Sequence, residues 1–185
     1  MIIDANFLDN LSNDLKRIVS DASEAIMVVY EKNTFDTEIK SDGSPVTEAD
    51  ENANKIIIQS LNIISPDISI VSEETYEKSD EIPNEPYWLV DPLDGTKEFI
   101  NKSKDFTVNI ALIEEGKPVY GIICAPVTGQ IWSGSRFQKS LPNDDAISTL
   151  RIVMSRSHQT KTDKEFLKFI ESLGISYEII EKGSS

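Results

Sequence analysis

An apolar strand runs directly into a carboxylate-rich segment in Trp88-Leu89-Val90-Asp91-Pro92-Leu93-Asp94-Gly95-Thr96-Lys97-Glu98-Phe99. Asp91 and Asp94 both lie at the carboxyl end of this strand, separated by a short step in the sequence. Pro92 and Gly95 are residues typical of turns, and they predict a tight turn around the two acids. The segment therefore delivers two carboxylates from a buried strand to one place.

Paired carboxylates at a strand end are typical of a binding site for a hard divalent cation. Mg²⁺ prefers oxygen ligands, usually one or two carboxylates together with carbonyls, waters and a phosphate of the substrate. Asp91, Asp94 and the Leu93 carbonyl are candidates for that set. A helix that begins at Gly95 or Thr96 would direct its free amides and the positive end of its dipole toward a phosphate.

Two further acidic clusters precede this segment. Glu73-Glu74 follow the apolar strand Ile68–Val71, and Asp50 stands three residues after Thr47 in a pattern that predicts a helix capping box. Taken singly, each cluster also fits a plain interpretation as a turn, a solvated surface or a helix cap. Taken together they favour a cation site, because like charges gathered in one place are unfavourable without a cation.

The chain begins with helices and continues with strands. Apolar residues recur at helical spacing from Leu8 to Val29, and a second helix is expected from Thr47 to about Leu61. Runs rich in β-branched and aromatic residues then predict strands at 68–71, 87–90, 106–113, 119–124 and 130–133. This order predicts an α+β fold, with an antiparallel sheet that carries helices on one face.

A polar stretch with Pro142 separates a second region from the first. We expect an N-terminal α+β domain at 1–136 that carries the metal site, a linker at 137–149 and the start of a second α/β domain at 150–185. The second region has a strand, a helix over Asp163–Leu173 and another strand, which is the pattern of a βαβ unit. One such unit has too little partner surface to bury its sheet, so we expect this second domain to be incomplete.

Composition excludes several classes of protein. The 185 residues include 18 basic and 32 acidic side chains, a net charge of −14, which argues against a partner such as duplex nucleic acid. No apolar run approaches the roughly 20 residues of a transmembrane helix. The N-terminus lacks the features of a secretion signal, so we expect a cytoplasmic location, with peripheral attachment to the inner membrane as an alternative. The single cysteine, Cys124, is expected to pack as a small apolar residue.

The motifs resemble those of a known family. Asp42-Gly43-Ser44-Pro45-Val46-Thr47-Glu48-Ala49-Asp50, Ser72-Glu73-Glu74 and the segment Trp88 to Phe99 are similar, in this order, to the lithium-sensitive, magnesium-dependent phosphomonoesterases. That superfamily includes inositol monophosphatases and fructose 1,6-bisphosphatases. Lys97-Glu98-Phe99 and Ser155-Arg156-Ser157-His158 resemble more closely its bacterial CysQ-type branch of 3′(2′),5′-bisphosphate nucleotidases. The resemblance implies a layered αβαβα sugar-phosphatase-like fold.

The resemblance also implies a role for each acidic residue. The implied Mg²⁺ ligands are Glu73, Asp91, the Leu93 carbonyl, Asp94 and Asp50. The implied catalytic residues are Asp50, Thr96 and Glu73, with Asp50 and Thr96 orienting and deprotonating the attacking water. Two cations in such a site clamp the attacking and leaving oxygens of an in-line displacement, so no covalent nucleophile is needed.

Substrate binding is implied at two places in the sequence. Asp94, Gly95 and Thr96 would hold the phosphate that is removed, and Arg156, His158 and Ser184 would contact a bisphosphorylated nucleotide. The implied reaction is hydrolysis of the 3′-phosphate of 3′-phosphoadenosine 5′-phosphate to AMP, a step in nucleotide metabolism and sulfur assimilation. The partner is thus a small phosphorylated nucleotide. An inositol monophosphatase or a sugar bisphosphatase is the alternative enzyme, and a homodimer is an open alternative for assembly.

One family motif is absent from the sequence. The family carries a later Trp-Asp motif whose Asp completes the second metal site, whereas Trp132 is followed by Ser133 here. Gly183-Ser184-Ser185 resembles a family segment that continues into a nucleotide-binding half, so we expect this sequence to represent a truncated form of the family's chain. If the protein truly stopped at Ser185, a metal-binding or nucleotide-binding remnant without catalytic activity would be the alternative.

Overall fold

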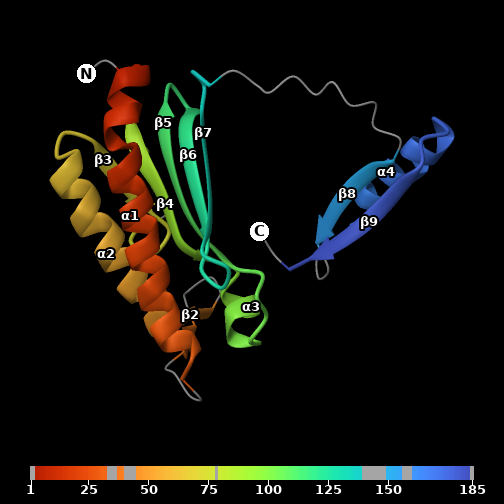
Figure 1. Ribbon diagram of the computed structural model, residues 1–185, viewed down its shortest axis with the longest axis horizontal. Helices are drawn as coiled ribbons and strands as arrows, with labels where there is room; N and C mark the ends of the chain where they lie inside the picture. Colours follow the sequence, from red (N-terminus) through yellow and green to blue (C-terminus); the bar gives the residue numbers. More distant parts are fainter. Residues whose placement is uncertain are drawn as a thin grey trace. The chain divides into compact units, whose positions relative to one another are not determined.

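The computed structural model describes residues 3–32, 37–39, 45–77, 79–138, 149–155 and 160–183. It divides into two compact units, Met1–Lys139 and Ser140–Ser185 (Figure 1). The division falls within the predicted linker, most of which lies outside the described residues, so the proposed domain boundaries stay a prediction. Within the described ranges, none of the helices combines the length and apolar character that crossing a bilayer needs.

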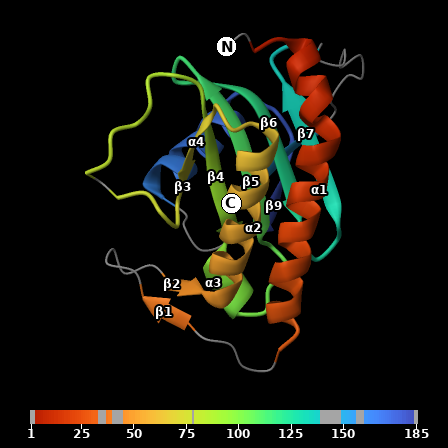
Figure 2. The same cartoon turned by 90° about the vertical axis from the view of Figure 1, so that its left-hand side faces the viewer.

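Two helices of the first unit follow the predicted apolar stripes. Helix α1 (Ala5–Tyr30) begins after Asp4, whose carboxylate accepts a hydrogen bond from the Phe7 amide at 2.8 Å. Helix α2 (Glu48–Ile64) begins with the predicted capping box between Thr47 and Asp50. Such caps satisfy amides that have no partner within the helix. Both helices bury one apolar stripe, and they pack side by side (Figure 2).

The sheet has the order β3-β4-β5-β6-β7, formed by Ser69–Ser72, Tyr87–Asp94, Thr107–Glu114, Lys117–Ala125 and Gln130–Ser135. All five strands were predicted, but the expected antiparallel pairing is wrong at one place. Strands β3 and β4 are parallel, while the other neighbouring pairs are antiparallel, so the sheet is mixed. The long connection between β3 and β4 allows the chain to re-enter the sheet in the same direction.

Helices cover one face of this sheet. Helix α1 packs against β5 and β6, and α2 packs against β4. Alternate side chains of the strands are buried beneath them, including Trp88, Ile110 and Ile122. Residues between these positions point to the opposite face, where Leu89 and Ile123 are exposed. The core therefore lies between the two helices and one side of the sheet.

The segment around Pro92 differs from the tight turn that the sequence predicted. No tight turn separates Asp91 from Asp94, because β4 continues to Asp94 with a shift in its register against β5 between the two acids. Proline has no amide hydrogen to donate to a neighbouring strand, and a β-bulge is a place where sheets tolerate it. The chain turns only at Gly95, whose φ is +91°, and helix α3 (Thr96–Ile100) follows directly as predicted.

One hairpin was not predicted from the sequence. Strands β1 (Thr37–Ile39) and β2 (Pro45–Thr47) pair antiparallel and lead into α2. Strands of three residues are too short for an alternating pattern to be recognised.

The second unit contains the predicted βαβ pattern. Strands β8 (Leu150–Ser155) and β9 (Tyr177–Lys182) are parallel, and α4 (Lys161–Ser172) connects them. Thr160 and Asp163 form a capping box at the start of α4. The structure thus confirms the order of elements that the sequence predicted for this region.

Candidate active site

The parallel pairing of β3 with β4 brings two acidic clusters together. Ser72 lies beside Val90 in the register, and the Glu73 amide donates to the Val90 carbonyl at 3.0 Å. Glu73 is therefore held next to Asp91, since both leave their strands at the same edge of the sheet. A side-chain hydrogen bond joins Glu73 and Asp91. The expectation that neighbouring strand ends gather these carboxylates is met for this pair.

The first turn of α2 supplies Asp50 to the same region. Oδ2 of Asp50 accepts hydrogen bonds from the amide and the hydroxyl of Thr47, at 2.8 and 2.7 Å. Its other oxygen, Oδ1, lies 3.1 Å from the hydroxyl of Thr96, which is also 3.2 Å from the Leu93 carbonyl. Asp50 is thus both a helix cap and a partner of Thr96. The interpretation of Asp50 as a helix cap is therefore compatible with its interpretation as a site residue.

Burial and mutual repulsion disfavour the charged forms of these acids. Burial raises the pKa of Asp91 to about 8, together with the negative charges of Glu73 and Asp94. Burial and the charges of Glu73 and Glu98 also raise the pKa of Asp94. The pKa of Asp50 is raised by burial, although the hydrogen bonds from Thr47 and Thr96 oppose that shift. The site therefore favours a proton or a cation close to its carboxylates.

The oxygen donors at this sheet edge are of the type that magnesium binds, although the carboxylates do not form a complete metal site. Within the residues that the structure describes, no three acidic, histidine or cysteine side chains converge as a ready-made metal site. The Asp91 Oδ1 atom is nevertheless buried and lacks a hydrogen-bond partner among those residues. Carboxylate oxygens of this kind are hard donors that suit a divalent cation.

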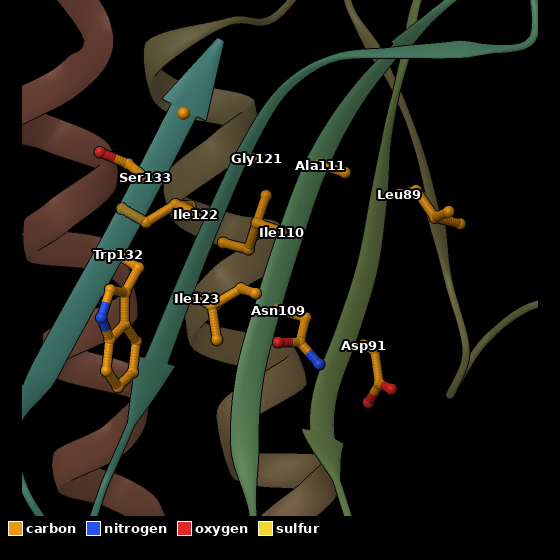
Figure 3. Close-up of a pocket in the computed structure, with 11 residues that line it drawn as sticks. Leu89, Asp91, Asn109, Ile110, Ala111, Gly121, Ile122, Ile123, Trp132 and Ser133 are labelled. Atoms are coloured by element: carbon orange, nitrogen blue, oxygen red, sulfur yellow. The ribbon is translucent and has the colours of Figure 1, made fainter. Parts of the chain in front are cut away.

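Open space adjoins these acids on the face of the sheet that the helices leave uncovered. A groove of about 520 Å³ runs over β4 to β7, with Asp91 and Asn109 at one end and Trp132 at another (Figure 3). A second recess of about 430 Å³ is lined by Glu73, Tyr87 and Asp91 among others. Asp91 lines both spaces, and Glu73 lines the second.

Asn109 is a site residue that was not predicted from the sequence. It lies opposite Asp91 in the register of β4 and β5, and its side chain forms a hydrogen bond with Asp94. A signal was present, because Thr107 and Asn109 are polar residues at alternate positions of an otherwise apolar strand. Alternate positions face the same side of a sheet. The Thr107 hydroxyl is buried and has no hydrogen-bond partner within the described part of the chain.

Some predicted site residues are not placed. Arg156, His158 and Ser184 lie outside the described residues, as do Asp42, Gly43 and Ser44 of the first motif. Their predicted roles stay predictions from the sequence.

Known proteins of one family resemble this chain in sequence. The profile of the Inositol monophosphatase family matches residues 8–172. The chain is 41% identical over 169 residues to the 3′(2′),5′-bisphosphate nucleotidase CysQ of Salmonella typhimurium, and the match covers 85% of this chain and 67% of the relative. The CysQ protein of Buchnera aphidicola is 38% identical over 184 residues, covering 90% of this chain and 69% of the relative.

Solved structures share the fold. The crystal structure of CysQ from Bacteroides thetaiotaomicron, described as a bacterial member of the inositol monophosphatase family, has a TM-score of 0.71 and 29% identity. The match covers 93% of this chain and 73% of that one. The suhB protein of Bartonella henselae also has a TM-score of 0.71, at 24% identity, over 95% of this chain and 71% of that one. These likenesses confirm the predicted fold class.

Proposed function

The chain belongs to the inositol monophosphatase family, and from this premise we propose that the protein is a magnesium-dependent phosphomonoesterase. We further propose that it removes the 3′-phosphate of 3′-phosphoadenosine 5′-phosphate and leaves AMP. The observation that carries the proposal is the meeting of Glu73 and Asp91 at one sheet edge. The choice of substrate is supported by the nucleotidases that are about 40% identical to the chain.

The proposed metal ligands are the acidic groups of this edge and one carbonyl: Glu73, Asp91, Leu93 through its carbonyl, Asp94 and Asp50. Carboxylate and carbonyl oxygens are the ligands that Mg²⁺ prefers. Bound magnesium supplies positive charge that offsets the negative charge of a phosphate ester.

The chain's own residues would handle the attacking water. When the Thr96 hydroxyl donates its hydrogen to Asp50, an oxygen lone pair of Thr96 is left to accept a hydrogen bond from that water. Asp50 then serves as the general base that receives a proton through Thr96, and the raised pKa of its carboxyl group favours this role. As the water oxygen bonds to phosphorus, the bond from phosphorus to the 3′-oxygen breaks, and that oxygen takes a proton from solvent.

The start of α3 is the proposed position of the phosphate that is removed. Gly95 precedes the first residue of α3, and its φ of +91° turns the chain from β4 into that helix. Asp94, Gly95 and Thr96 are the proposed contacts. Arg156, His158 and Ser184 are proposed contacts for the remainder of the nucleotide on the basis of sequence alone.

Phosphate release from a panel of substrates tests this proposal. The protein is assayed with Mg²⁺ and equal concentrations of 3′-phosphoadenosine 5′-phosphate, inositol 1-phosphate and fructose 1,6-bisphosphate, with and without Li⁺. We expect the highest kcat/KM on the adenosine bisphosphate. Equal or better turnover of inositol 1-phosphate would assign the protein to the inositol monophosphatases, and no release from any substrate would contradict an enzymatic role.

Replacing Arg156 or His158 tests the proposed contacts with the 5′-phosphate of the substrate. A cationic partner for the 5′-phosphate contributes to binding of the bisphosphate but not of a monophosphate. We therefore expect Arg156→Ala and His158→Ala to reduce kcat/KM for the adenosine bisphosphate and largely to spare inositol 1-phosphate. An equal reduction for both substrates would contradict this assignment.

A further inference from the structure

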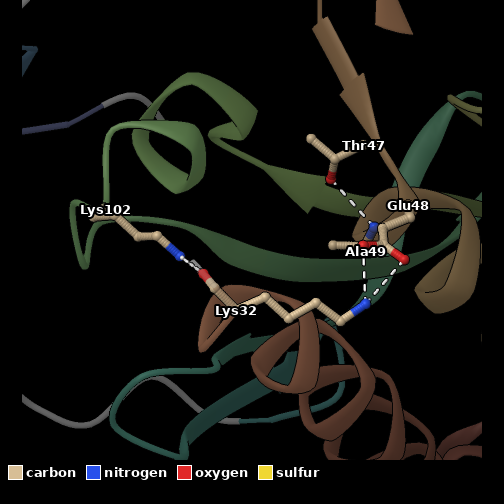
Figure 4. Close-up of polar contacts among 5 residues, drawn as sticks. All are labelled: Lys32, Thr47, Glu48, Ala49 and Lys102. Carbon is tan, nitrogen blue, oxygen red and sulfur yellow. Dashed lines mark hydrogen bonds and ion pairs between the residues drawn. The ribbon is translucent and has the colours of Figure 1, made fainter. Parts of the chain in front are cut away.

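A lysine from a distant part of the chain places its positive charge at the C-terminus of helix α1. The last turn of α1 contains no basic residue, although the free carbonyls at a helix end attract positive charge. The ammonium group of Lys102 fills this role, because Nζ donates to the Tyr30 carbonyl. Nζ also donates to the Lys32 carbonyl at 3.1 Å (Figure 4). The same Nζ lies 4.6 Å from the centre of the Tyr30 ring. Lys102 thus ties the turn after α3 to the end of α1.

Tyr30 makes the reciprocal connection. Its hydroxyl lies 2.9 Å from the Lys102 carbonyl and 3.2 Å from the Ser103 carbonyl, either of which can accept its hydrogen. Its ring packs against Phe99 and Phe106, with centres 5.5 and 5.2 Å away. Phe99 belongs to α3 and is fully buried. The side chain of Tyr30 therefore contacts the segment at the end of α3, and the side chain of Lys102 contacts the end of α1.

The backbone of Lys102 gives a second reason to assign it a specific role. Its φ is +57°, in the left-handed region that glycine adopts without steric cost and that lysine adopts only at a cost. In this conformation the Lys102 side chain contacts the end of α1. A residue held in a strained conformation beside a site is a reason to examine its role there.

The end of α1 also contacts the start of α2. The Lys32 ammonium lies 3.0 and 3.1 Å from the two carboxylate oxygens of Glu48, the first residue of α2 (Figure 4). Asp50 follows two positions later and meets Thr96 of α3. The contacts thus form a closed ring through α1, α3 and α2. The Lys32–Glu48 pair is partly exposed, and exposed ion pairs contribute little to stability.

We propose that Lys102 and Tyr30 are positioning residues that hold Thr96 of α3 against Asp50 of α2. Helix α3 has five residues, and a helix that short has no stability of its own, so its position depends on tertiary contacts. Lys102 and Tyr30 act through Thr96 and do not touch the substrate. Their effect on the reaction rests on the proposed function, while their effect on α3 does not.

Hydrogen exchange tests the effect on α3 without any assay of activity. In wild type the Phe99 amide donates to the Gly95 carbonyl, and the Asn101 amide donates to the Lys97 carbonyl. We expect Lys102→Met, which keeps an apolar side chain but removes the ammonium, to speed exchange at these two amides. Lys102→Arg restores a cation and should restore protection. Lys104→Met is the matched control, because Lys104 is an exposed lysine on the same loop, and its exchange should equal wild type.

Steady-state kinetics test the effect on the reaction. Small displacements of catalytic groups lower turnover, so we expect Lys102→Met to reduce kcat by about three- to tenfold and to leave KM within about twofold. Tyr30→Phe, which keeps the ring but removes the hydroxyl, should act in the same direction. Lys102→Arg should recover most of kcat, and Lys104→Met should match wild type. A purely structural role would instead reduce the amount of folded protein and leave kcat per folded molecule unchanged.

The outcomes separate the two proposals. Unchanged exchange at α3 in Lys102→Met would overturn the positioning role, and so would an equal loss of kcat in Lys104→Met. Wild-type protein that releases no phosphate from any substrate would overturn the proposed function. In that case faster exchange in Lys102→Met would still support the structural link, and unchanged exchange would overturn it.

Discussion

The Thr96 hydroxyl lies 3.1 Å from Oδ1 of Asp50, which joins the first residue of α3 to the first turn of α2 across 46 positions of sequence. The other oxygen of the same carboxylate is occupied by Thr47. One acidic side chain therefore caps a helix and also faces a candidate catalytic hydroxyl. In the proposed mechanism Asp50 is the general base, and these hydrogen bonds orient its carboxylate.

Asp50→Asn tests that role. The amide keeps an oxygen that can accept from Thr47 but loses the carboxylate that accepts a proton through Thr96. We expect kcat to fall by roughly 10²-fold or more, with a much smaller change in KM. The control is Glu51→Gln, which neutralises the exposed acid next to Asp50. An unchanged kcat in Asp50→Asn, or an equal loss in Glu51→Gln, would show that the assigned role is wrong.

Magnesium should stabilise the folded protein through the acids at the end of β4. A ligand that binds only the folded state raises the free energy of unfolding by roughly 2.7 kcal/mol at a concentration of about 100 times its Kd. We expect a rise in Tm when Mg²⁺ is added to wild type and none in the double variant Asp91→Asn, Asp94→Asn. Asp67→Asn alters an exposed acid before β3 and should retain the rise. A shift of equal size in the double variant would place the bound ion elsewhere.

The stability of the metal-free protein should depend on pH through Asp91. Its pKa is near 3.8 when unfolded and about 8 when folded, so the folded state binds the proton more tightly. The stabilisation from this proton is fully present below about pH 4, declines as pH rises, and is lost above about pH 8. Denaturant unfolding in EDTA should therefore show a larger loss of stability between pH 5.5 and 8.5 in wild type than in Asp91→Asn. Equal losses would contradict the raised pKa.

Gly95 should tolerate no side chain. Its φ is +91°, and a Cβ atom there would lie 3.0 Å from the Asp105 carbonyl oxygen. We expect Gly95→Ala to lower the free energy of unfolding by at least about 1 to 2 kcal/mol, because a residue with a Cβ is strained in this conformation. Gly121→Ala is the matched control, since nothing lies within 4 Å of a Cβ atom at that position. Denaturant unfolding of the two variants should separate them, and equal stability would refute the steric argument.

Local patterns in the sequence were enough to predict much of this fold. The stripe of α1, the capping box of α2 and the five strands of the sheet are all encoded by residues close together in the chain. The direction of β3 relative to β4 could not be predicted, because it depends on the path of the connection between the strands. The sequence also placed acids at the ends of β3 and β4, and their proximity follows once that pairing is known.

Contacts between distant segments could not be predicted. Tyr30 and Lys102 are 72 positions apart, and neither belongs to a recognisable motif. Their association depends on how α1 and α3 pack, which no local pattern encodes. Asn109 is different, because a polar residue at an alternate position of an apolar strand could have been recognised.

Phosphate release from 3′-phosphoadenosine 5′-phosphate during a titration with Mg²⁺, for wild type and Asp91→Asn, tests the central claim most directly. We expect no release by EDTA-treated wild type, a rise with Mg²⁺ to a plateau, and only background release by Asp91→Asn at every concentration. Release by wild type that does not depend on Mg²⁺, or a titration curve of Asp91→Asn equal to that of wild type, would contradict the account.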